Sequence, residues 1–312
     1  MFILLYNNIL MIIEKKEGKI VTYYVDKDYD NNKLTKVLNT KLRRNQIQFI
    51  IDHDADVYTK EGKLLLKFRK NILDTTKVDD FYKNVISFAQ KKTSNRGSAT
   101  GSKSKNVRDN PEIMTNIIGY FDKLSPKQKQ LMRNQGKTIS VTARETRFNM
   151  DYPEKFKKLL PLIKEIDTYY KKYIPEKYSK QVKKANETYF RIPGTAFTTV
   201  TTNVNLQTSV HLDRGDDDDG FGNLAVIENG KYSGGETCFP QYGIGVDVRT
   251  NDILYMNVHE AHGNLPIILE TPDAKRLSIV CYLRKSVWQQ TRGKSKRFLI
   301  RHNKTIKNLR VT

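Results

Sequence analysis

Thr195-Ala-Phe-Thr-Thr-Val-Thr-Thr-Asn-Val-Asn205 is the stretch that decides the fold, because its β-branched residues alternate as in a strand. Short apolar runs separated by Gly-rich or Asp-rich turns follow it: Asn223–Ile227, Glu236–Phe239, Gly245–Val248, Asp252–Met256 and Arg276–Tyr282. Many short strands at regular spacing are typical of a sandwich or jelly roll rather than of alternating strands and helices. The sequence therefore predicts a mainly β core.

The clearest helix precedes these strands, between Asp151 and Tyr178. Its apolar residues recur at the helical spacing that marks a core-facing stripe, namely Phe156, Leu159, Leu160, Ile163, Ile166 and Tyr170. Pro161 within this run predicts a kink or two shorter helices, because proline interrupts the helical hydrogen bonds. The class is therefore α+β, a β core with flanking helices.

The N-terminal part predicts a small α/β extension. Its strand-like runs are Lys19–Val25, Gln48–Ile51 and Lys63–Phe68, and Val78–Gln90 resembles a helix. The run from Lys91 to Lys105 is small, polar and basic, which is typical of a mobile loop or linker. We expect an extension over residues 1–90, a basic linker or loop over 91–110, a core over 111–285 and a basic tail over 286–312.

The charge balance indicates a polyanionic partner. Formal net charge is +21, from 55 Lys and Arg against 34 Asp and Glu, which favours nucleic acid and DNA first. A Lys- and Asn-rich composition produced by an AT-rich genome is the alternative. The run Arg284–Thr312 holds ten Lys and Arg and no acid, and this concentration favours a basic surface. The candidate phosphate contacts are residues 91–108 and Arg284, Lys285, Arg292, Lys294, Lys296 and Arg297, with Trp288 and Phe298 as stacking surfaces or core residues.

Cysteine usage and the first residues bear on compartment. Two cysteines, Cys238 and Cys281, cannot form a disulfide framework, so we expect a reducing, intracellular location in the nucleus or cytoplasm. The apolar start of 13 residues, broken by Asn7-Asn8, is too short to span a bilayer and fits a buried strand. Translation starting at Met11 is a second explanation. We expect no membrane partner, and the oligomeric state is left open.

His211-Leu-Asp213 and the later His262 form a candidate metal site. On one strand, residues two apart point to the same face, so His211 and Asp213 can reach one ion. Two histidines and one carboxylate are the ligands of non-haem Fe(II) oxygenases. His259 is the alternative third ligand, and we favour His262. The two remaining histidines, His53 and His302, are interpreted as solvated.

Arg276 follows His262 by fourteen residues and starts a strand-like run. A planar guanidinium suits bidentate binding of a carboxylate, here the distal carboxylate of a co-substrate such as 2-oxoglutarate. Ser278 lies on the same face and can add a hydroxyl donor. The alternative is a surface cation at the start of an edge strand.

Three further polar features have two interpretations each. Asn203 and Asn205 share a face of the strand before His211, so one of them, with Asn205 as our choice, can orient the near carboxylate of 2-oxoglutarate or the oxygen site. The alternative for each is a core asparagine that bonds the backbone. The acidic run Asp216–Asp219 fits a solvated turn, and the alternative is a charge gate near the metal.

The stretch from about Ile117 to Lys285 resembles the TET/JBP family of 2-oxoglutarate- and Fe(II)-dependent dioxygenases, and members from viruses and mobile elements most of all. The matching pieces occur in the family's order and include His211-Leu-Asp-Arg-Gly-Asp216, Gly220-Phe-Gly-Asn-Leu224, Gly234-Gly-Glu236 with Pro240, His262-Gly-Asn-Leu-Pro266 and Arg276-Leu-Ser278. One departure is Asn251-Asp252 where the family usually has Gly-Asp. Asparagine tolerates the same left-handed turn.

The resemblance implies a double-stranded β-helix core, a cupin-like jelly roll, that oxidises the methyl group of a pyrimidine in nucleic acid. Fe(II), 2-oxoglutarate and O2 are the implied cofactors. Two alternatives keep other functions open: a hydroxylase of a protein side chain or small molecule, and a catalytically dead, basic nucleic-acid-binding protein. The intact set of His211, Asp213, His262 and Arg276 argues against the last.

Overall fold

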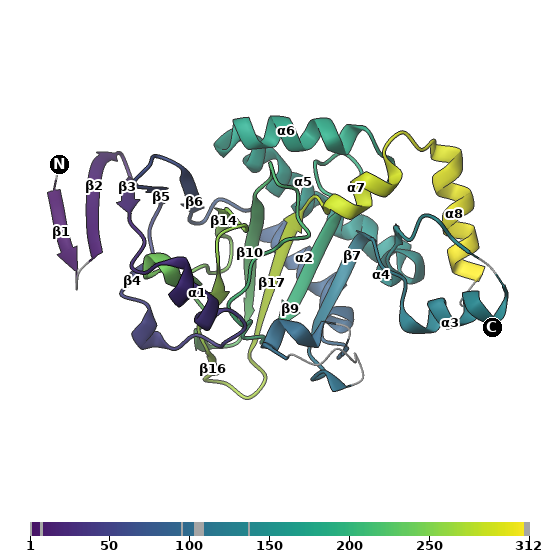
Figure 1. Ribbon diagram of the computed structural model, residues 1–312, viewed down its shortest axis with the longest axis horizontal. Coiled ribbons are helices and arrows are strands. Elements are labelled where there is room, and N and C mark those ends of the chain that lie inside the picture. Colours follow the sequence, from purple (N-terminus) through teal and green to yellow (C-terminus); the bar gives the residue numbers. More distant parts are fainter. Residues whose placement is uncertain (1, 7–8, 95, 103–108, 137, 309–312) are drawn as a thin grey trace. The chain divides into compact units, whose positions relative to one another are not determined.

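The computed structural model describes residues 2–6, 9–94, 96–102, 109–136 and 138–308 (Figure 1). The chain divides into two units, each assembled from separate stretches of sequence. Unit 1 comprises Met1–Asn116, Thr202–Arg214 and Gly222–Val280, and unit 2 comprises Ile117–Thr201, Gly215–Phe221 and Cys281–Thr312. All candidate ligands of the metal and of the co-substrate fall in unit 1.

The described residues of unit 1 form three sheets. In the largest, its strands run in the order β1-β2-β3-β5-β6-β14-β10-β17, and the others are β15-β12-β13-β4 and β11-β16. The bounds are β1 Phe2–Tyr6, β2 Ile9–Glu17, β3 Ile20–Val25, β4 Phe49–Ile51, β5 Ala55–Thr59, β6 Leu64–Arg69, β10 Gly222–Asn229, β11 Tyr232–Gly234, β12 Thr237–Phe239, β13 Ile244–Val246, β14 Ile253–Met256, β15 Gly263–Asn264, β16 Ile267–Leu269 and β17 Lys275–Tyr282.

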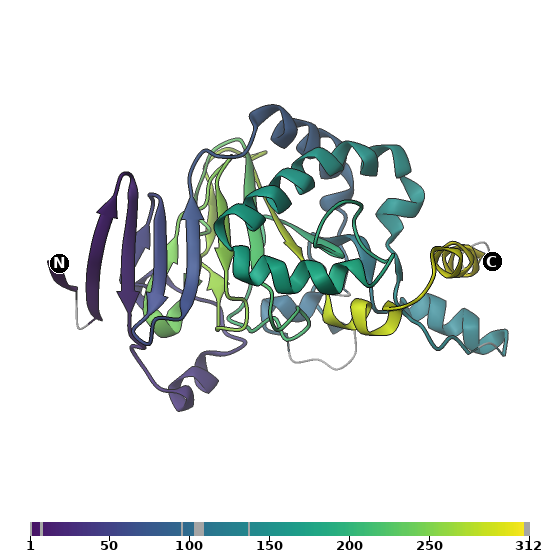
Figure 2. The same cartoon turned by 90° about the horizontal axis from the view of Figure 1, so that it is seen from above.

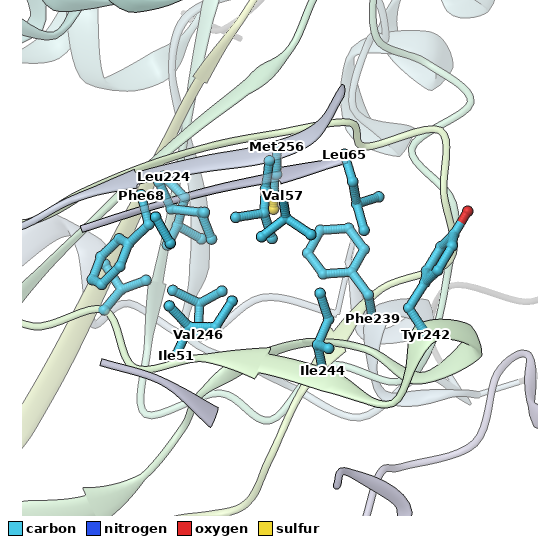
Figure 3. Close-up of a cluster of buried hydrophobic side chains, with 14 of the residues drawn as sticks. Ile51, Val57, Leu65, Phe68, Leu224, Phe239, Tyr242, Ile244, Val246 and Met256 are labelled. Carbon is cyan, nitrogen blue, oxygen red and sulfur yellow. The ribbon is translucent and has the colours of Figure 1, made fainter. Parts of the chain in front are cut away.

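The main core of unit 1 lies between the large sheet and the four-stranded sheet (Figure 3). Val57, Phe68 and Met256 come from the large sheet, and Ile51 and Val246 come from the other. All five side chains are buried. Alternating strands place one apolar face of each sheet against the other, which is the arrangement of a β-sandwich. The predicted sandwich is confirmed.

The N-terminal residues belong to this sandwich and are not an extension outside it. β6 pairs with β14 in antiparallel fashion, with Phe68 opposite Leu254, and β4 pairs with β13 in parallel, with Ile51 opposite Val246. Figure 2 shows the purple N-terminal strands side by side in the large sheet. The predicted boundary at residue 90 is therefore wrong. Strand pairing between distant segments leaves no trace in local composition, and the sequence could not reveal it.

Two α-helices and three 3-10 turns complete the described part of unit 1. α1 (Asn31–Val37) and α2 (Thr75–Ala89) begin at Asp30 and Asp74, whose side chains accept a hydrogen bond from a backbone N–H of the first turn. The predicted helix at Val78–Gln90 is confirmed. In the predicted loop, the described residues contain the 3-10 turn η2 (Gly97–Thr100), and Ala99 O accepts from Ser209 N at 2.8 Å. The other 3-10 turns are η1 (Arg44–Gln46) and η4 (Pro240–Tyr242).

Unit 2 is mainly helical. Its elements are α3 (Pro126–Asn134), β8 (Arg144–Glu145), α4 (Arg147–Asp151), α5 (Pro153–Tyr173), α6 (Pro175–Asn186), α7 (Lys285–Thr291) and α8 (Lys296–Asn308). The predicted apolar stripe is buried in α5 at Leu159, Ile163, Ile166 and Tyr170. The helix continues through Pro161, and the break falls at Pro175, which starts α6. Three strands have residues in both units: β7 (Thr115–Phe121), β9 (Thr199–Val204) and β17.

Across the described residues, no helix has the length and apolar character needed to cross a membrane. The predicted basic tail is helical where it is described, because α7 and α8 occupy most of it. His302, predicted as solvated, is buried in α8, and its Nε2 lies 2.8 Å from Ala143 O. His53 is half-buried, with Nε2 2.8 Å from the Tyr23 hydroxyl. The prediction is therefore wrong for His302, whose burial arises from tertiary packing that the local sequence does not encode, whereas His53 keeps part of its exposure.

Candidate metal centre

His211 and His262 are joined by their main chains. His211 N donates to His262 O at 2.8 Å, and His262 N donates to His211 O at 2.9 Å. The two residues form an isolated antiparallel bridge, so His211 is not inside a regular strand as predicted. The bridge brings the ring centroids within 4.5 Å of each other. Two side chains fifty-one positions apart in sequence therefore face one small volume.

Asp213 completes the cluster. Its Oδ1 lies 3.6 Å from His211 Nε2, and its Oδ2 lies 3.5 Å from His262 Nε2. One ligand atom from each residue lies within 4.8 Å of the others. Among the described residues, this is the group of His, Cys, Asp and Glu side chains whose geometry fits one metal ion. The structure brings together the three predicted ligands.

The second imidazole nitrogen of each histidine fixes the orientation of its ring. His211 Nδ1 lies 2.7 Å from Ser209 O, and His262 Nδ1 lies 2.9 Å from Glu260 O. A carbonyl oxygen only accepts, so each Nδ1 carries a proton and donates it. Nε2 of each ring is consequently the atom presented to Asp213. Backbone partners of this kind orient metal-binding histidines in proteins.

The pKa values of the cluster reflect mutually dependent charges in a partly buried site, where His262 is buried and His211 and Asp213 are half-buried. Burial lowers the pKa of His211, and repulsion from His262 lowers it further. Burial acts to raise the pKa of Asp213, but the hydrogen bond from His262 and the charge of His211 outweigh it, and this pKa is lowered. Burial opposes charging of His262, yet Asp213 raises its pKa above the usual value. Asp213 is thus held as a carboxylate that attracts a cation.

His259, the alternative ligand, is not part of the cluster. Its backbone N donates to Asn257 Oδ1 at 3.2 Å, in the turn between β14 and His262. The choice of His262 over His259 is therefore what the geometry supports.

The Gly and Asn that follow His262 hold the two ligand-bearing segments together. A Cβ at Gly263 would lie 3.3 Å from Ser209 O, so glycine lets the segments approach closely. Asn264 Oδ1 accepts from both Thr208 N and Thr208 Oγ1 at 2.8 Å. Its Nδ2 donates to Leu206 O at 3.2 Å and Leu265 O at 2.9 Å. The His-Gly-Asn motif therefore aligns the backbone of His211 with that of His262.

Arg276 is buried in β17, with 4% of its surface exposed. Burial lowers the pKa of its guanidinium, and the nearby Tyr232 hydroxyl acts in the opposite direction. Its Nε has no hydrogen-bond partner although it is fully buried. A buried, incompletely paired guanidinium is costly, which is the state expected of a side chain that binds an anion. The prediction of a surface cation on an edge strand is not supported.

The glycine pair before Glu236 provides the space for Arg276. A Cβ at Gly235 would lie 2.8 Å from Arg276 Nε and 3.0 Å from its Cδ. Gly235 N donates to Pro266 O at 3.0 Å, four residues beyond His262. Glu236 Oε2 is also buried without a partner. The Gly-Gly motif thus adapts the backbone to the arginine and connects it to the segment that carries His262.

Ser278 belongs to a short hydrogen-bonded chain beside Arg276. Thr115 Oγ1 donates to Asn203 Oδ1 at 2.9 Å, and Asn203 Nδ2 donates to Ser278 Oγ at 3.3 Å. Ser278 is buried and lies two residues from Arg276 on β17. Because the Asn203 amide donates to Ser278 Oγ, the hydroxyl proton of Ser278 points away from Asn203. The hydroxyl is consequently available as a donor.

Asn205 has a backbone role. Its Oδ1 accepts from Arg276 N at 2.7 Å, and its Nδ2 donates to Ala274 O at 3.0 Å. Its φ of 49° lies in the left-handed region, just after β9 ends at Val204. The side chain is used to anchor the start of β17, which favours the alternative of a core asparagine. Asn251 has a φ of 69°, so the left-handed turn expected there is confirmed.

Arg96 is a residue that the sequence did not single out at this site. Its charge contributes to the lowered pKa of both His211 and Asp213, after the larger effects of burial and of the neighbouring imidazoles. It lies in the basic run from Lys91, which we assigned as a whole to phosphate contacts. Residues 95 and 103–108 of that assignment lie outside the described part of the chain. A single arginine in a basic run carries no local signal that distinguishes it.

The predicted nucleic-acid residues separate into two groups. Arg284 is largely buried, and its Nε donates to Asp122 Oδ1 at 2.5 Å. Lys285 pairs with Asp218. Both pair with carboxylates of unit 2, which leaves less of their charge for a phosphate, and their assignment as phosphate contacts stays a prediction. The other four predicted side chains are exposed: Arg292, Lys294, Lys296 and Arg297.

The acidic run is only partly a solvated turn, because Asp218 and Asp219 keep much of their exposure while the first two residues do not. Asp216 and Asp217 are buried, and Lys184 pairs with both Asp217 and Asp219. The run neutralises lysines and arginines of unit 2, which also argues against a charge gate. The two aromatic residues of the basic tail pack within unit 2, Phe298 against Phe190 at 6.2 Å and Trp288 beside a cluster that contains Leu283.

The donor set fits a ferrous ion. Two oriented imidazoles and one ionised carboxylate match the facial arrangement of non-haem iron oxygenases, which leaves coordination positions open. The buried, unpartnered Nε of Arg276 and the Ser278 hydroxyl fit a carboxylate of a co-substrate. The fit rests on the chemistry of the donors present in unit 1.

Comparisons with known proteins agree with this arrangement. Residues 131–285 match the Tet_JBP model, the oxygenase domain of the 2OGFeDO superfamily. Thymine dioxygenase JBP1 of Trypanosoma brucei brucei is 29% identical over 209 residues, which are 66% of this chain and 22% of that protein. Thymine dioxygenase JBP1-A of Trypanosoma cruzi (strain CL Brener) is 32% identical over 176 residues, 56% of this chain and 20% of that protein. The chain spans about a fifth of the length of these relatives.

A solved structure supports the fold over nearly the whole chain. NgTET1 in complex with 5mC DNA is similar with a TM-score of 0.54 at 15% sequence identity, and 90% of each chain is covered. At this identity the likeness concerns the fold. The double-stranded β-helix with flanking helices is therefore confirmed.

Proposed function

Since this chain belongs to the TET/JBP family of 2-oxoglutarate- and Fe(II)-dependent dioxygenases, we propose that it hydroxylates the methyl group of a pyrimidine base in nucleic acid. The base is thymine or 5-methylcytosine, and DNA is the first choice of substrate. The observation that carries the proposal is the cluster of His211, Asp213 and His262, with both Nε2 atoms presented to one carboxylate.

His211 Nε2, a carboxylate oxygen of Asp213 and His262 Nε2 would hold the ferrous ion. Bound there with 2-oxoglutarate and O2, the ion supplies the oxidising power that breaks the C–H bond of a methyl group. Ser209 O and Glu260 O keep the imidazoles in the required tautomer and orientation.

Arg276 and Ser278 would hold the far carboxylate of 2-oxoglutarate. A guanidinium with a free Nε donor offers the bidentate pairing that a carboxylate prefers. Burial of Arg276 removes competing water and strengthens that pairing.

A methyl group of a base stacked in duplex DNA cannot enter a half-buried metal centre. The base must leave the stack, which costs a few kcal/mol. Contacts with phosphates can offset that cost, and the chain carries a net charge of +21 to provide them.

The test is product analysis with two substrates. Duplex DNA containing either unmodified cytosine or 5-methylcytosine is incubated with protein, Fe(II), 2-oxoglutarate and O2, digested to nucleosides and analysed by mass spectrometry. We expect a nucleoside one oxygen atom heavier than thymidine or than 5-methyldeoxycytidine, with an equal amount of succinate. The Asp213→Ala variant is the inactive control.

The outcomes discriminate among the functions considered. If succinate formed only with a protein or small-molecule substrate, that substrate and not nucleic acid would be the target of the enzyme. Iron and 2-oxoglutarate binding without any product on DNA or RNA would contradict the proposal.

A further inference from the structure

The positive charge of the chain is concentrated in unit 2. Unit 2 has 28 Lys and Arg against 12 Asp and Glu, a net charge of +16, whereas unit 1 has 27 against 22, a net charge of +5. Unit 2 is also the smaller of the two, so its charge density is several times higher. The surplus is therefore not a uniform compositional bias of the whole chain.

Within unit 2, seven of the twelve acids have basic partners among the described residues, and three of these are Asp151, Glu154 and Glu176. Asp217 and Asp219 pair with Lys184, Asp218 pairs with Lys285, and Asp122 pairs with Arg284. The last 32 residues, 281–312, contain ten Lys and Arg and no acid. Apart from Arg284 and Lys285, the Lys and Arg residues of this stretch therefore have no acidic residue on the same segment to neutralise them.

Helix α8 has two distinct faces. The inner face packs on unit 2 through Phe298, His302 and Ile306. The rings of Phe298 and His302 lie 6.2 and 5.9 Å from that of Phe190, and Ile306 is fully buried beside Leu124. His302 Nε2 lies 2.8 Å from Ala143 O. These contacts fix which side of the helix faces away from the unit.

The outer face carries Arg297, Arg301 and Lys304. All three are exposed, and their spacing of four and then three residues places them in one row along the helix. Within the described residues, none of the three forms an ion pair. Lys307, on the flank of the helix, is close enough to Glu145 for its charge to oppose the rise that burial causes in the pKa of that carboxyl group. Ile300 lies beside the row and is 61% exposed.

We propose that the row Arg297, Arg301 and Lys304 on α8 binds the phosphate backbone of duplex DNA. The inference rests on the proposed function, since it names the surface that positions the nucleic acid. The row extends over about 10 Å at 1.5 Å per residue, long enough to meet several phosphates of one strand. The apolar face of α8 is already buried within unit 2, which disfavours insertion of this helix into a lipid surface.

Binding by such a row is electrostatic and independent of sequence. Each phosphate contact releases condensed counterions, so the logarithm of affinity falls with the logarithm of salt concentration by about 0.9 per contact. Removal of three contacts therefore lowers this slope by about 2.7 and weakens binding by about ten-fold or more near 0.1 M salt.

The experiment measures DNA binding without turnover. The protein is titrated into a fluorescein-labelled duplex without iron or 2-oxoglutarate, and anisotropy is recorded over a series of salt concentrations. The test variant carries Arg297→Gln, Arg301→Gln and Lys304→Gln. The matched control carries Lys36→Gln, Lys63→Gln and Lys83→Gln, three exposed lysines of unit 1, and so loses the same charge.

We expect the α8 variant to lose affinity and salt slope as stated, while the control stays close to the parent protein. If both variants lost the same DNA affinity, the loss would be caused by net charge alone, and the proposal would be overturned. Unchanged binding in the α8 variant, or binding to phosphatidylserine vesicles but not to DNA, would also overturn it. Thermal denaturation of each variant verifies folding. Product analysis remains a separate test, so failure of this surface leaves the oxygenase proposal standing.

Discussion

His211 and His262 hydrogen-bond each other through their main chains in both directions, at 2.8 and 2.9 Å. The reciprocal bond ties the first and last metal-ligand candidates into one rigid frame, to which Asp213 is attached two residues away. A site built on backbone pairing is pre-organised before any ion arrives, because the imidazoles need no rearrangement to share one cation.

His262→Ala should abolish tight metal binding, whereas His259→Ala should preserve it. The reason is that His262 Nε2 faces Asp213 and His259 is outside the cluster. We expect at least a 100-fold loss of Fe(II) or Co(II) affinity for His262→Ala, since second-sphere changes alone cost 10–100-fold. Anaerobic titration calorimetry measures the affinity. Equal affinities in the two variants would refute the ligand assignment.

Arg276→Met should raise the 2-oxoglutarate requirement strongly. Methionine keeps much of the buried stem but removes the guanidinium, and loss of a desolvated charge pair costs about 2–5 kcal/mol. The dissociation constant of 2-oxoglutarate is measured with Mn(II) in place of iron, in the absence of O2. Lys275→Met on the same strand is the control, because Lys275 Nζ donates only to Asp273 O among the recorded bonds. A parental constant in Arg276→Met would remove Arg276 from the site.

Gly235→Ala should damage co-substrate binding through Arg276. Both Gly235 and Gly62 have positive φ, 80° and 76°, so alanine costs about 1–2 kcal/mol of backbone strain at either position. Only at Gly235 does the new Cβ approach an arginine, at 2.8 Å from Nε, whereas nothing lies within 4 Å at Gly62.

The two glycine variants are compared by 2-oxoglutarate binding and by thermal denaturation. We expect a larger loss of stability for Gly235→Ala, because its Cβ also crowds Arg276, and a much weaker 2-oxoglutarate affinity for Gly235→Ala alone. If the Gly62→Ala variant lost affinity to the same degree, crowding of Arg276 would not be the cause.

Asn264→Ala should weaken both the fold and the metal site. The substitution leaves Thr208 N without its acceptor and two carbonyls without a donor, at about 1–3 kcal/mol for each buried group left unpaired. Asn264→Asp retains the acceptor for Thr208 and should retain part of the stability. Urea denaturation and metal titration of the three proteins give the ranking, and a parental Asn264→Ala would contradict the clamp.

Arg284→Ala should destabilise the protein without changing its DNA contacts. Arg284 is paired with the buried Asp122, and removal of one partner of a buried pair costs about 3–5 kcal/mol. Denaturation measures the loss, and the salt dependence of DNA binding is recorded at a temperature where the variant is folded. A lowered salt slope would show that Arg284 reaches phosphate after all.

The local sequence was sufficient to predict several strands of the sandwich and its longest helix. β-branched alternation located β9, β10 and β17, and the apolar stripe located α5, because the periodicity of side chains depends only on neighbouring residues. The spacing of motifs also predicted the candidate site residues His211, Asp213, His262 and Arg276, since metal and carboxylate chemistry restricts which residue types can bind these groups.

Tertiary structure alone decided which histidine faces Asp213, and it placed residues 49–69 inside the sandwich. It also distinguished two arginines: Arg284 forms an ion pair with Asp122, whereas Arg297 is exposed on α8. Both are arginines in one basic run, and their sequence context is alike. Burial and charge pairing depend on residues far away in the chain, so these distinctions exist only once the chain has folded.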